Sequence, residues 1–420
     1  MVETIDAAFA FAAAAALAWI LVPVAESLAW KIGAIDRPRD RSLHLEPTPK
    51  LSGAAILLAV LISGAIFLPW NEETRAILLG AAAIAAVGVA DDVFDLPPLI
   101  KLLGQVAAAI IPVSAGVTVD VFTLPFVGGV DPGATKLFEL PLVGNVDLGE
   151  VGTVFGIVAM ANVVNLIDGV DGLAAGVCVI SAATLAAVAL SLDRNPAGVL
   201  AAITAGGALG FLRHGFPPAS SFMGDTGSNL LGYLLAATAV QGALKTNAVV
   251  ALAFPMLVLA VPILDTGFVV AKRLKYRRPI YEADSWHFHH RMANIGFSQR
   301  RTLAYLYGWT LVMAGVALAL RFIPYSDDRG NFDTELTSLM IAILLLGVAA
   351  SFYVIYVLEI LKLRRFRQRQ VAASGAIAGP EDVDREVKHE LETGRFREPD
   401  PETGEFGRID PAKPGEGPPN

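Results

Sequence analysis

Long apolar stretches separated by short polar ones run along almost the whole chain. A helix needs roughly 20 apolar residues, within a range near 17–25, to cross about 30 Å of hydrocarbon. The run at 197–212 is short for a span, so ten spans are the alternative to eleven. The pattern predicts an all-α polytopic membrane protein with about 11 transmembrane helices. The apolar runs centre on residues 7–30, 51–69, 75–91, 101–118, 151–167, 171–192, 197–212, 228–244, 247–271, 302–322 and 336–360.

The distribution of Lys and Arg predicts which side of the membrane each loop occupies. If the N-terminus is outside, the inward loops hold about twenty Lys and Arg residues and the outward loops about six. Positive charge near the ends of spans marks the cytoplasmic side. We therefore expect the N-terminus outside and the C-terminus inside.

Composition agrees with a chain whose solvent is mostly lipid, because only 17% of its residues are charged, against about 25% in soluble domains. The net charge of −8 is concentrated in residues 371–420, which hold twelve acidic and six basic residues. This Pro-, Gly- and Glu-rich segment predicts a disordered acidic cytoplasmic tail after an integral membrane domain at 1–370. Residues 119–150 alternate β-branched or aromatic residues with turn residues, so we expect a small external β-hairpin there.

Five polar clusters lie at the ends of apolar runs, and the charge distribution places all five on the cytoplasmic side. Carboxylates, histidines, amides and glycines gathered on one face suggest a metal-assisted site for a phosphorylated substrate. The clusters are Arg41–Lys50, Asp91–Asp95, Asn162–Gly172, Phe222–Ser228 and His287–Arg291.

The acidic cluster directly follows an apolar run. A carboxylate at a helix C-terminus meets the negative end of the helix dipole, and the adjacent carboxylates of Asp91 and Asp92 repel each other. The trio with Asp95 is therefore costly unless a cation or a proton lies between its members. A hard cation such as Mg²⁺, which prefers oxygen ligands, would meet this need. The simpler interpretation is a polar cap at the end of a span.

The second cluster places Asn162, Asn165, Asp168 and Asp171 at every third position, beside two glycines. Glycine weakens a helix by about 1 kcal/mol, so we expect a span end followed by a tight turn that gathers amides and carboxylates. Asn and Asp in turns often satisfy only the nearby backbone, which is the alternative for each residue taken singly.

Phe222–Ser228 precedes an apolar run, so Asp225, Thr226 or Ser228 could serve as its N-cap. The free N–H groups and the positive dipole end of that helix would also suit a phosphate. An acidic residue there would repel phosphate unless a metal bridges the two, and Asp225 is therefore the first choice for a metal ligand.

The histidine cluster lies in the largest basic loop, 272–301. A zinc site is one interpretation of its His-x-His-His pattern, but a fourth ligand is not obvious. We favour hydrogen bonds from His287, His289 and His290 to phosphate or sugar, with Arg291 forming a bidentate pair with phosphate oxygens.

Three motifs together carry a resemblance to a known family: Asn-x-x-Asn-x-x-Asp-Gly-x-Asp-Gly-Leu, then Phe-Met-Gly-Asp-x-Gly-Ser, then His-x-His-His-Arg. The chain resembles the polyprenyl-phosphate N-acetylhexosamine-1-phosphate transferases over about residues 31–310. The histidine cluster looks like the bacterial WecA/TagO-type branch and unlike the branch that transfers phospho-MurNAc-pentapeptide. The tail after about residue 370 lies outside the resemblance.

The resemblance implies an enzyme of the bacterial inner or plasma membrane with a cytoplasmic active site. Its substrates would be a UDP-N-acetylhexosamine, most simply UDP-GlcNAc, and undecaprenyl phosphate or a related polyprenyl phosphate lipid, with UMP released. The implied cofactor is Mg²⁺, with Mn²⁺ as an alternative, and a homodimer is a further implication. No nucleic-acid partner is expected. The alternatives are another UDP-HexNAc donor or, outside the enzyme class, a transporter with an intramembrane ion path.

The resemblance also implies roles for individual residues. Asp225 would bind Mg²⁺ on the diphosphate, while Asp91 and Asp92 would orient or deprotonate the acceptor. The candidate site comprises catalytic Asp91, Asp92 and Asp168, substrate-binding Lys50, Asn165, Asp171, Phe222, His287, His289, His290 and Arg291, and the metal ligand Asp225. Among these, Phe222 and Asp171 would contact uracil, Asn165 and Asp168 would support that pocket, and the histidine cluster would help recognise the sugar phosphate.

Overall fold

The computed structural model describes ten helices and three small sheets. It covers residues 4–37, 47–119, 122–124, 128–130, 132–140, 144–243, 298–324 and 333–353, with single residues or pairs within 263–270 and 368–388. The helices are α1 (Thr4–Ile32), α2 (Ser52–Phe67), α3 (Glu72–Phe94), α4 (Pro98–Ser114), α5 (Leu148–Ile167), α6 (Leu173–Ser191), α7 (Asn195–Gly215), α8 (Gly224–Ala243), α12 (Gln299–Phe322) and α13 (Thr334–Tyr353).

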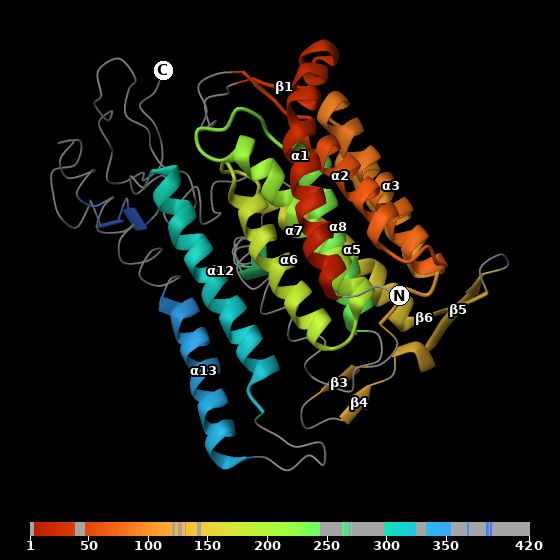
Figure 1. Cartoon of the computed structure of the whole chain (residues 1–420), viewed down its shortest axis with the longest axis vertical. Helices are drawn as coiled ribbons and strands as arrows, with labels where there is room; N and C mark the ends of the chain where they lie inside the picture. The colour runs from red at the N-terminus through yellow and green to blue at the C-terminus, as the bar shows by residue number, and fades with distance from the viewer. Residues whose placement is uncertain are drawn as a thin grey trace. The chain divides into compact units, whose positions relative to one another are not determined.

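The mostly helical, polytopic architecture expected from the apolar runs is confirmed (Figure 1). Seven of the described helices are long and apolar enough to cross a membrane, and α2 and α4 are shorter apolar helices. The run at 197–212, which looked short, forms α7 and is one of the seven. The run at 247–271 lies largely outside the described residues, so the total of eleven spans stays a prediction.

Local sequence explains where the helices near the carboxylates begin and end. Asp147 and Glu150 form a capping box at the start of α5, with each side chain accepting from the other residue's backbone N–H. The helix α3 ends at Asp95, which adopts a left-handed backbone with φ +48°. Two proline residues follow after Leu96, and the second, Pro98, opens α4, where its fixed φ suits a first helical position. Both helix ends therefore follow from short-range chemistry.

The described strands form three two-stranded antiparallel sheets. The first pairs β1 (Ile35–Asp36) with β2 (Thr48–Pro49), so the end of the first polar cluster is joined to the residues that follow α1. In the region expected to hold one hairpin, two sheets occur instead: β3 (Phe122–Leu124) with β4 (Gly128–Val130), and β5 (Lys136–Leu140) with β6 (Gly144–Asp147). The 3₁₀ turn η1 (Pro132–Ala134) lies between them in the chain. Which side of the membrane these strands occupy stays a prediction.

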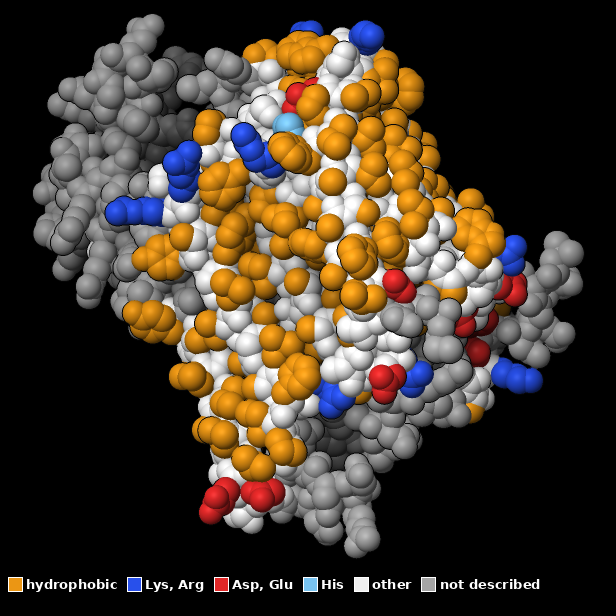
Figure 2. All heavy atoms as spheres, in the orientation of Figure 1, with side chains coloured by type: hydrophobic (Ala, Val, Ile, Leu, Met, Phe, Trp, Pro, Cys, Tyr) orange, Lys and Arg blue, Asp and Glu red, His pale blue; other side chains and the backbone are white. Residues whose placement is uncertain are grey.

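The helix α8 lies at the centre of the packing, in contact with α2, α3, α5, α6 and α7. Its residues 228–237 are all buried, although several are polar. Close approach depends on glycine: a Cβ on Gly232 would lie 2.6 Å from the Ala161 Cα of α5. Small residues at helix contacts are expected where lipid gives no hydrophobic drive to association. The outer helix surfaces carry many exposed large apolar side chains, and Figure 2 shows them spread over this face of the described helices.

The helices α1 and α7 also approach each other closely through glycine. A Cβ on Gly206 would lie 2.2 Å from the Phe11 carbonyl oxygen, and one on Gly210 would lie 2.3 Å from the Ala15 carbonyl oxygen. Neither backbone oxygen can move aside as a flexible side chain could. Gly207, on the same helix, has room for a methyl group, because its Cβ would lie 3.4 Å from the Ile56 side chain, an ordinary van der Waals distance.

We predict opposite effects for two neighbouring glycine-to-alanine changes in α7. Gly210→Ala should lower the free energy of unfolding by about 1–3 kcal/mol, because the added methyl forces α1 and α7 apart. Gly207→Ala should be neutral or stabilising by up to about 1 kcal/mol, because alanine is the better helix former. Denaturant unfolding of the purified protein in detergent measures both, and equal stabilities for the two variants would contradict the packing described.

Candidate functional site

The carboxylate of Asp92, near the end of α3, caps the first turn of α8. One oxygen accepts from the Asp225 N–H at 3.0 Å. The other accepts from the Thr226 N–H at 3.0 Å and from the Thr226 hydroxyl at 2.7 Å. Asp92 is only 6% exposed, and these bonds to the positive end of a helix dipole make its burial tolerable. A side chain distant in sequence thus does what a local N-cap normally does.

This cap corrects two expectations from the sequence. Asp225, Thr226 or Ser228 could have served as the N-cap of α8, whereas the cap that the structure shows comes from another helix. The N–H groups of Asp225 and Thr226 were expected to be free for a phosphate, and Asp92 already occupies both. The reason is that a negative charge buried beside a helix N-terminus is the stronger and permanent acceptor. Whether Asp92 also acts in catalysis stays a prediction.

Gly224 makes this contact geometrically feasible. Its φ is +64°, a left-handed conformation that glycine adopts without strain. A Cβ at this position would also lie 2.5 Å from an Asp92 carboxylate oxygen and 2.5 Å from the Lys50 carbonyl oxygen. Two separate constraints therefore require glycine in the Met-Gly-Asp motif: the left-handed backbone conformation and the lack of space for a Cβ.

Lys101, which the sequence reasoning missed, lies between two carboxylates. Its ammonium group is 2.9 Å from an Asp91 oxygen and also pairs with an Asp225 oxygen. The other oxygen of Asp91 accepts from the Leu96 N–H at 2.9 Å. The available signal was a single lysine in the first turns of an apolar helix, α4, shortly after the acidic cluster. A cation in that place offsets the negative charges of Asp91 and Asp225.

Asp225 is held on both sides. Its second oxygen accepts from the Asn165 amide at 2.8 Å, and the same amide lies 2.9 Å from the Ser228 hydroxyl. The side chain thus lies between a lysine from α4 and an asparagine from α5, at the start of α8. Helices α3, α4, α5 and α8 each contribute one side chain to this group, which we call the carboxylate site: Asp91, Lys101, Asn165 and Asp225.

A second polar layer lies one helical turn from the carboxylate site. Each member of this layer lies three or four residues from a member of the carboxylate site and so shares its helix face. The pairs are Gln105 with Lys101, Asn162 with Asn165, and Asn229 with Asp225. Gln105 donates to Asn229 at 3.1 Å and accepts from Asn162 at 2.7 Å. The Asn229 amide donates to the Asp225 backbone carbonyl at 2.8 Å. These buried amides tie α4, α5 and α8 together directly beneath the carboxylates.

The turn after α5 brings further acidic groups close. Burial, together with the negative charges of Asp225, Asp92 and Asp171, raises the pKa of the Asp168 carboxyl well above its usual range. The Asp171 carboxylate accepts from the Ala219 N–H at 3.2 Å and so fixes the loop before the Phe222 motif. The expected gathering of this turn with the Asp225 motif is thus observed. The uracil contact expected of Asp171 stays a prediction.

Phe222 and Lys50 lie together beside the carboxylate site. The Phe222 N–H donates to the Pro49 carbonyl at 2.8 Å, and its carbonyl accepts from the Ser52 N–H at 3.2 Å. The Lys50 ammonium is 3.9 Å from an Asp92 oxygen. His287, His289, His290 and Arg291 lie outside the described residues, and their placement in the site stays a prediction.

The donor set fits a magnesium ion shared with a substrate. Among the residues that the structure describes, no group of three or more His, Cys, Asp or Glu side chains is arranged to hold a metal. Mg²⁺ usually uses only one or two carboxylates and completes its shell with waters and substrate phosphates. The Asp91 and Asp225 carboxylates, with a lysine ammonium already between them, offer a pair of this kind.

Comparison with known proteins finds a family match over the segment that contains this site. Residues 74–243, from α3 to α8, match the model of glycosyl transferase family 4. The chain is 36% identical over 303 residues to a probable undecaprenyl-phosphate N-acetylglucosaminyl 1-phosphate transferase of Bacillus subtilis, covering 71% of this chain and 81% of the relative. It is 34% identical over 328 residues to a decaprenyl-phosphate N-acetylglucosaminephosphotransferase of Mycobacterium tuberculosis, covering 71% and 78%. A phospho-N-acetylmuramoyl-pentapeptide-transferase of Desulforudis audaxviator is 30% identical over 344 residues, covering 75% and 97%.

The amide layer generates a stability prediction. Gln105→Leu and Asn162→Leu should each destabilise the protein by about 1–3 kcal/mol, because each leaves an amide of the layer without one of its hydrogen-bond partners. The double variant should lose clearly less than the sum, because removing both partners leaves fewer orphaned groups. Denaturant unfolding of the wild type, the two single variants and the double variant in detergent forms a double-mutant cycle. Strictly additive losses of unfolding free energy would show that the two amides do not interact.

Proposed function

The chain belongs to glycosyl transferase family 4, and we propose that it transfers N-acetylglucosamine 1-phosphate from UDP-GlcNAc to a polyprenyl phosphate in the membrane, releasing UMP. The relatives named for this activity match most of their own length, and the matched family segment contains every member of the carboxylate site. The observation that carries the proposal is Asp225, held at the start of α8 between Lys101 and Asn165. The product would enter the synthesis of a cell-wall or surface polysaccharide.

The reaction joins two anions, so charge neutralisation is its main requirement. A phosphate oxygen of the acceptor forms a bond to the β-phosphorus of the donor. The bond from that phosphorus to the bridging oxygen breaks, and its electron pair leaves on the phosphate of UMP. A lipid phosphate with a second pKa near 6 is largely ionised at neutral pH and needs little help from a base.

The residues of the carboxylate site divide this work. The Lys101 ammonium offsets negative charge beside the carboxylates, while Asn165 holds the orientation of Asp225. Asp92 fixes the start of α8 and thereby the position of Asp225. Mg²⁺, or Mn²⁺ in its place, would be held by Asp225 and Asp91 and would supply positive charge to the diphosphate of the donor.

The proposal also includes the orientation of the protein in the membrane and the contacts of the substrate. We place the site on the cytoplasmic face of a bacterial plasma membrane, with eleven spans, an outside N-terminus, the two sheets β3–β4 and β5–β6 outside and the acidic tail inside. The charge distribution of the loops supports this orientation. Phe222 and Asp171 would contact the uracil, and the cluster His287–Arg291 would contact the sugar phosphate. A homodimer is included in the proposal on family resemblance.

The function is tested by following UMP release. Purified protein in detergent, given UDP-GlcNAc, polyprenyl phosphate and Mg²⁺, should release UMP and form a lipid-linked sugar diphosphate. A panel with UDP-GalNAc and UDP-MurNAc-pentapeptide in place of UDP-GlcNAc identifies the donor, and we expect UDP-GlcNAc to give the highest kcat/KM. Absence of UMP with every donor would remove the proposal, and a clear preference for another donor would correct the substrate.

Asp225→Asn should lower kcat by about 100-fold or more, because the carboxylate charge that would bind the metal is lost while the side-chain shape is kept. Asp193→Asn is the matched control. Asp193 is exposed between α6 and α7 with φ +56°, a conformation that asparagine also tolerates. The control should retain wild-type activity. Activity of Asp225→Asn within tenfold of wild type would exclude Asp225 as an essential metal ligand.

A further inference from the structure

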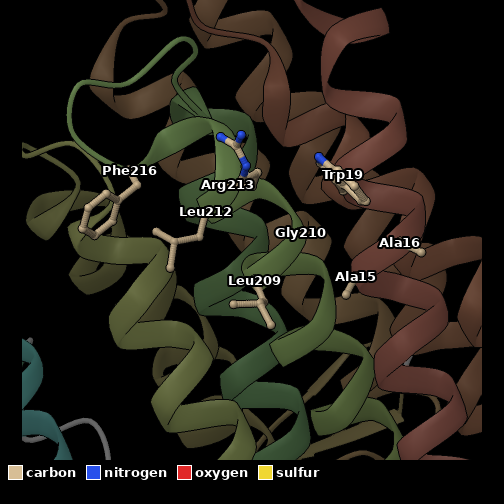
Figure 3. Close-up of a pocket in the computed structure, with 8 residues that line it drawn as sticks. All are labelled: Ala15, Ala16, Trp19, Leu209, Gly210, Leu212, Arg213 and Phe216. Carbon is tan, nitrogen blue, oxygen red and sulfur yellow. The ribbon is translucent and has the colours of Figure 1, made fainter.

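A groove of about 860 Å³ follows the contact between α1 and α7 on the outer surface (Figure 3). Its walls are apolar along most of their length: Ala15, Ala16 and Trp19 come from α1, while the leucine and glycine residues of the α7 wall include Leu209 and Gly210. Trp19 is 55% exposed and Leu209 is 40% exposed, so the groove is open to whatever surrounds the helices. In a protein of this class that surrounding is lipid.

The two helices run parallel, and their register sets the depth of the groove. Phe11 lies against Gly206, Ala15 against Gly210, and Trp19 against His214, so each step of four residues on α1 matches four on α7. The helix α7 ends at Gly215, whereas α1 continues for thirteen residues beyond Trp19. Glu26, the next charged residue on α1, lies seven residues beyond Trp19, a rise of about 10 Å. The groove therefore ends at Trp19, before α1 reaches its first charged residue on that side, Glu26.

Arg213 stands at that end of the groove, as Figure 3 shows, with its side chain beside Trp19. It is exposed, and within the described part of the chain no carboxylate pairs with it. Glu26, on the same stretch of α1, is instead 3.9 Å from the His214 ring and accepts from the Ser220 hydroxyl at 3.2 Å. An exposed guanidinium next to an apolar groove suits an anionic ligand with an apolar chain.

We infer that this groove binds an anionic phospholipid of the bilayer, with an acyl chain along the apolar walls and the phosphate on Arg213. The charge is complementary, and Arg suits phosphate because its planar fork donates two parallel hydrogen bonds. Trp19 lines the same end of the groove, and tryptophan is enriched near lipid headgroups. Basic pockets between membrane helices are known to take such headgroups.

The groove is separate from the carboxylate site. Its walls are α1 and α7, whereas Asp91, Lys101, Asn165 and Asp225 come from α3, α4, α5 and α8. The occupant is therefore a bilayer phospholipid and not the polyprenyl phosphate that the carboxylate site would use. This inference does not depend on the proposed function.

Native mass spectrometry of the full chain after lipid removal tests the inference. Phosphatidylglycerol and phosphatidylcholine with identical acyl chains are titrated separately. One phosphatidylglycerol should bind the wild type about fivefold more tightly than phosphatidylcholine, as about 1 kcal/mol per basic side chain implies. Arg213→Gln should remove that preference, and Ala16→Phe should weaken the binding of both lipids by filling the groove. A phosphatidylglycerol with a photoreactive acyl chain should crosslink to peptides of residues 15–19 and 209–216.

Arg75→Gln is the matched control, because Arg75 is also exposed but lies at the start of α3, away from the groove. It should keep the wild-type preference. The inference is overturned if Arg213→Gln keeps the preference, if Arg75→Gln loses it equally, or if the crosslinks map to other helices. Displacement of phosphatidylglycerol by one equivalent of polyprenyl phosphate would also overturn it, by assigning the groove to the acceptor. Since Arg213 and Ala16 are both exposed, unchanged unfolding of these variants separates lipid binding from stability.

Discussion

The bonds from the first turn of α8 to the Asp92 carboxylate are the constraint on which the site depends. They fix the position and rotation of α8 relative to α3, and with them the point at which Asp225 leaves the helix. Lys101 and Asn165 then reach Asp225 from two further helices without any long loop. A carboxylate that caps a helix thus serves here to align a neighbouring carboxylate, and the amide layer beneath it keeps the other helices in the same register.

The lipid environment explains why the surrounding helices are built from small and polar residues. Lipid tails are as apolar as leucine, so burying apolar side chains between helices gives little association energy. Close backbone contact at Gly206 and Gly210 and interhelical hydrogen bonds through Gln105 supply it instead. Buried amides stabilise such a bundle only when their partners are present, and here each amide of the layer has one.

Much of this arrangement could be predicted from the sequence, because the lengths of apolar runs and the spacing of polar clusters are local properties. The helices, the carboxylate turn after α5 and the gathering of Asp91, Asn165 and Asp225 follow from such properties together with the family resemblance. The Asp92 cap could not be predicted in this way, since its partners lie 133 residues away and a local N-cap was available in the pattern. Lys101 was missed because a single lysine in an apolar helix is usually interpreted as a side chain that extends its ammonium group to the membrane surface. Only its partners in the fold show that it lies between two carboxylates.

The distance along the chain between Asp92 and its partners has a consequence for biosynthesis. Asp91 meets Lys101 ten positions later, so that pair is complete almost as soon as α4 is made. The donors for Asp92 appear 133 residues after it, which takes on the order of ten seconds at about 5–20 residues per second. Throughout that interval α3 carries a carboxylate whose α8 partners have not been made. Until α8 has been made, the Asp92 carboxylate therefore lacks the N–H donors that make its burial tolerable.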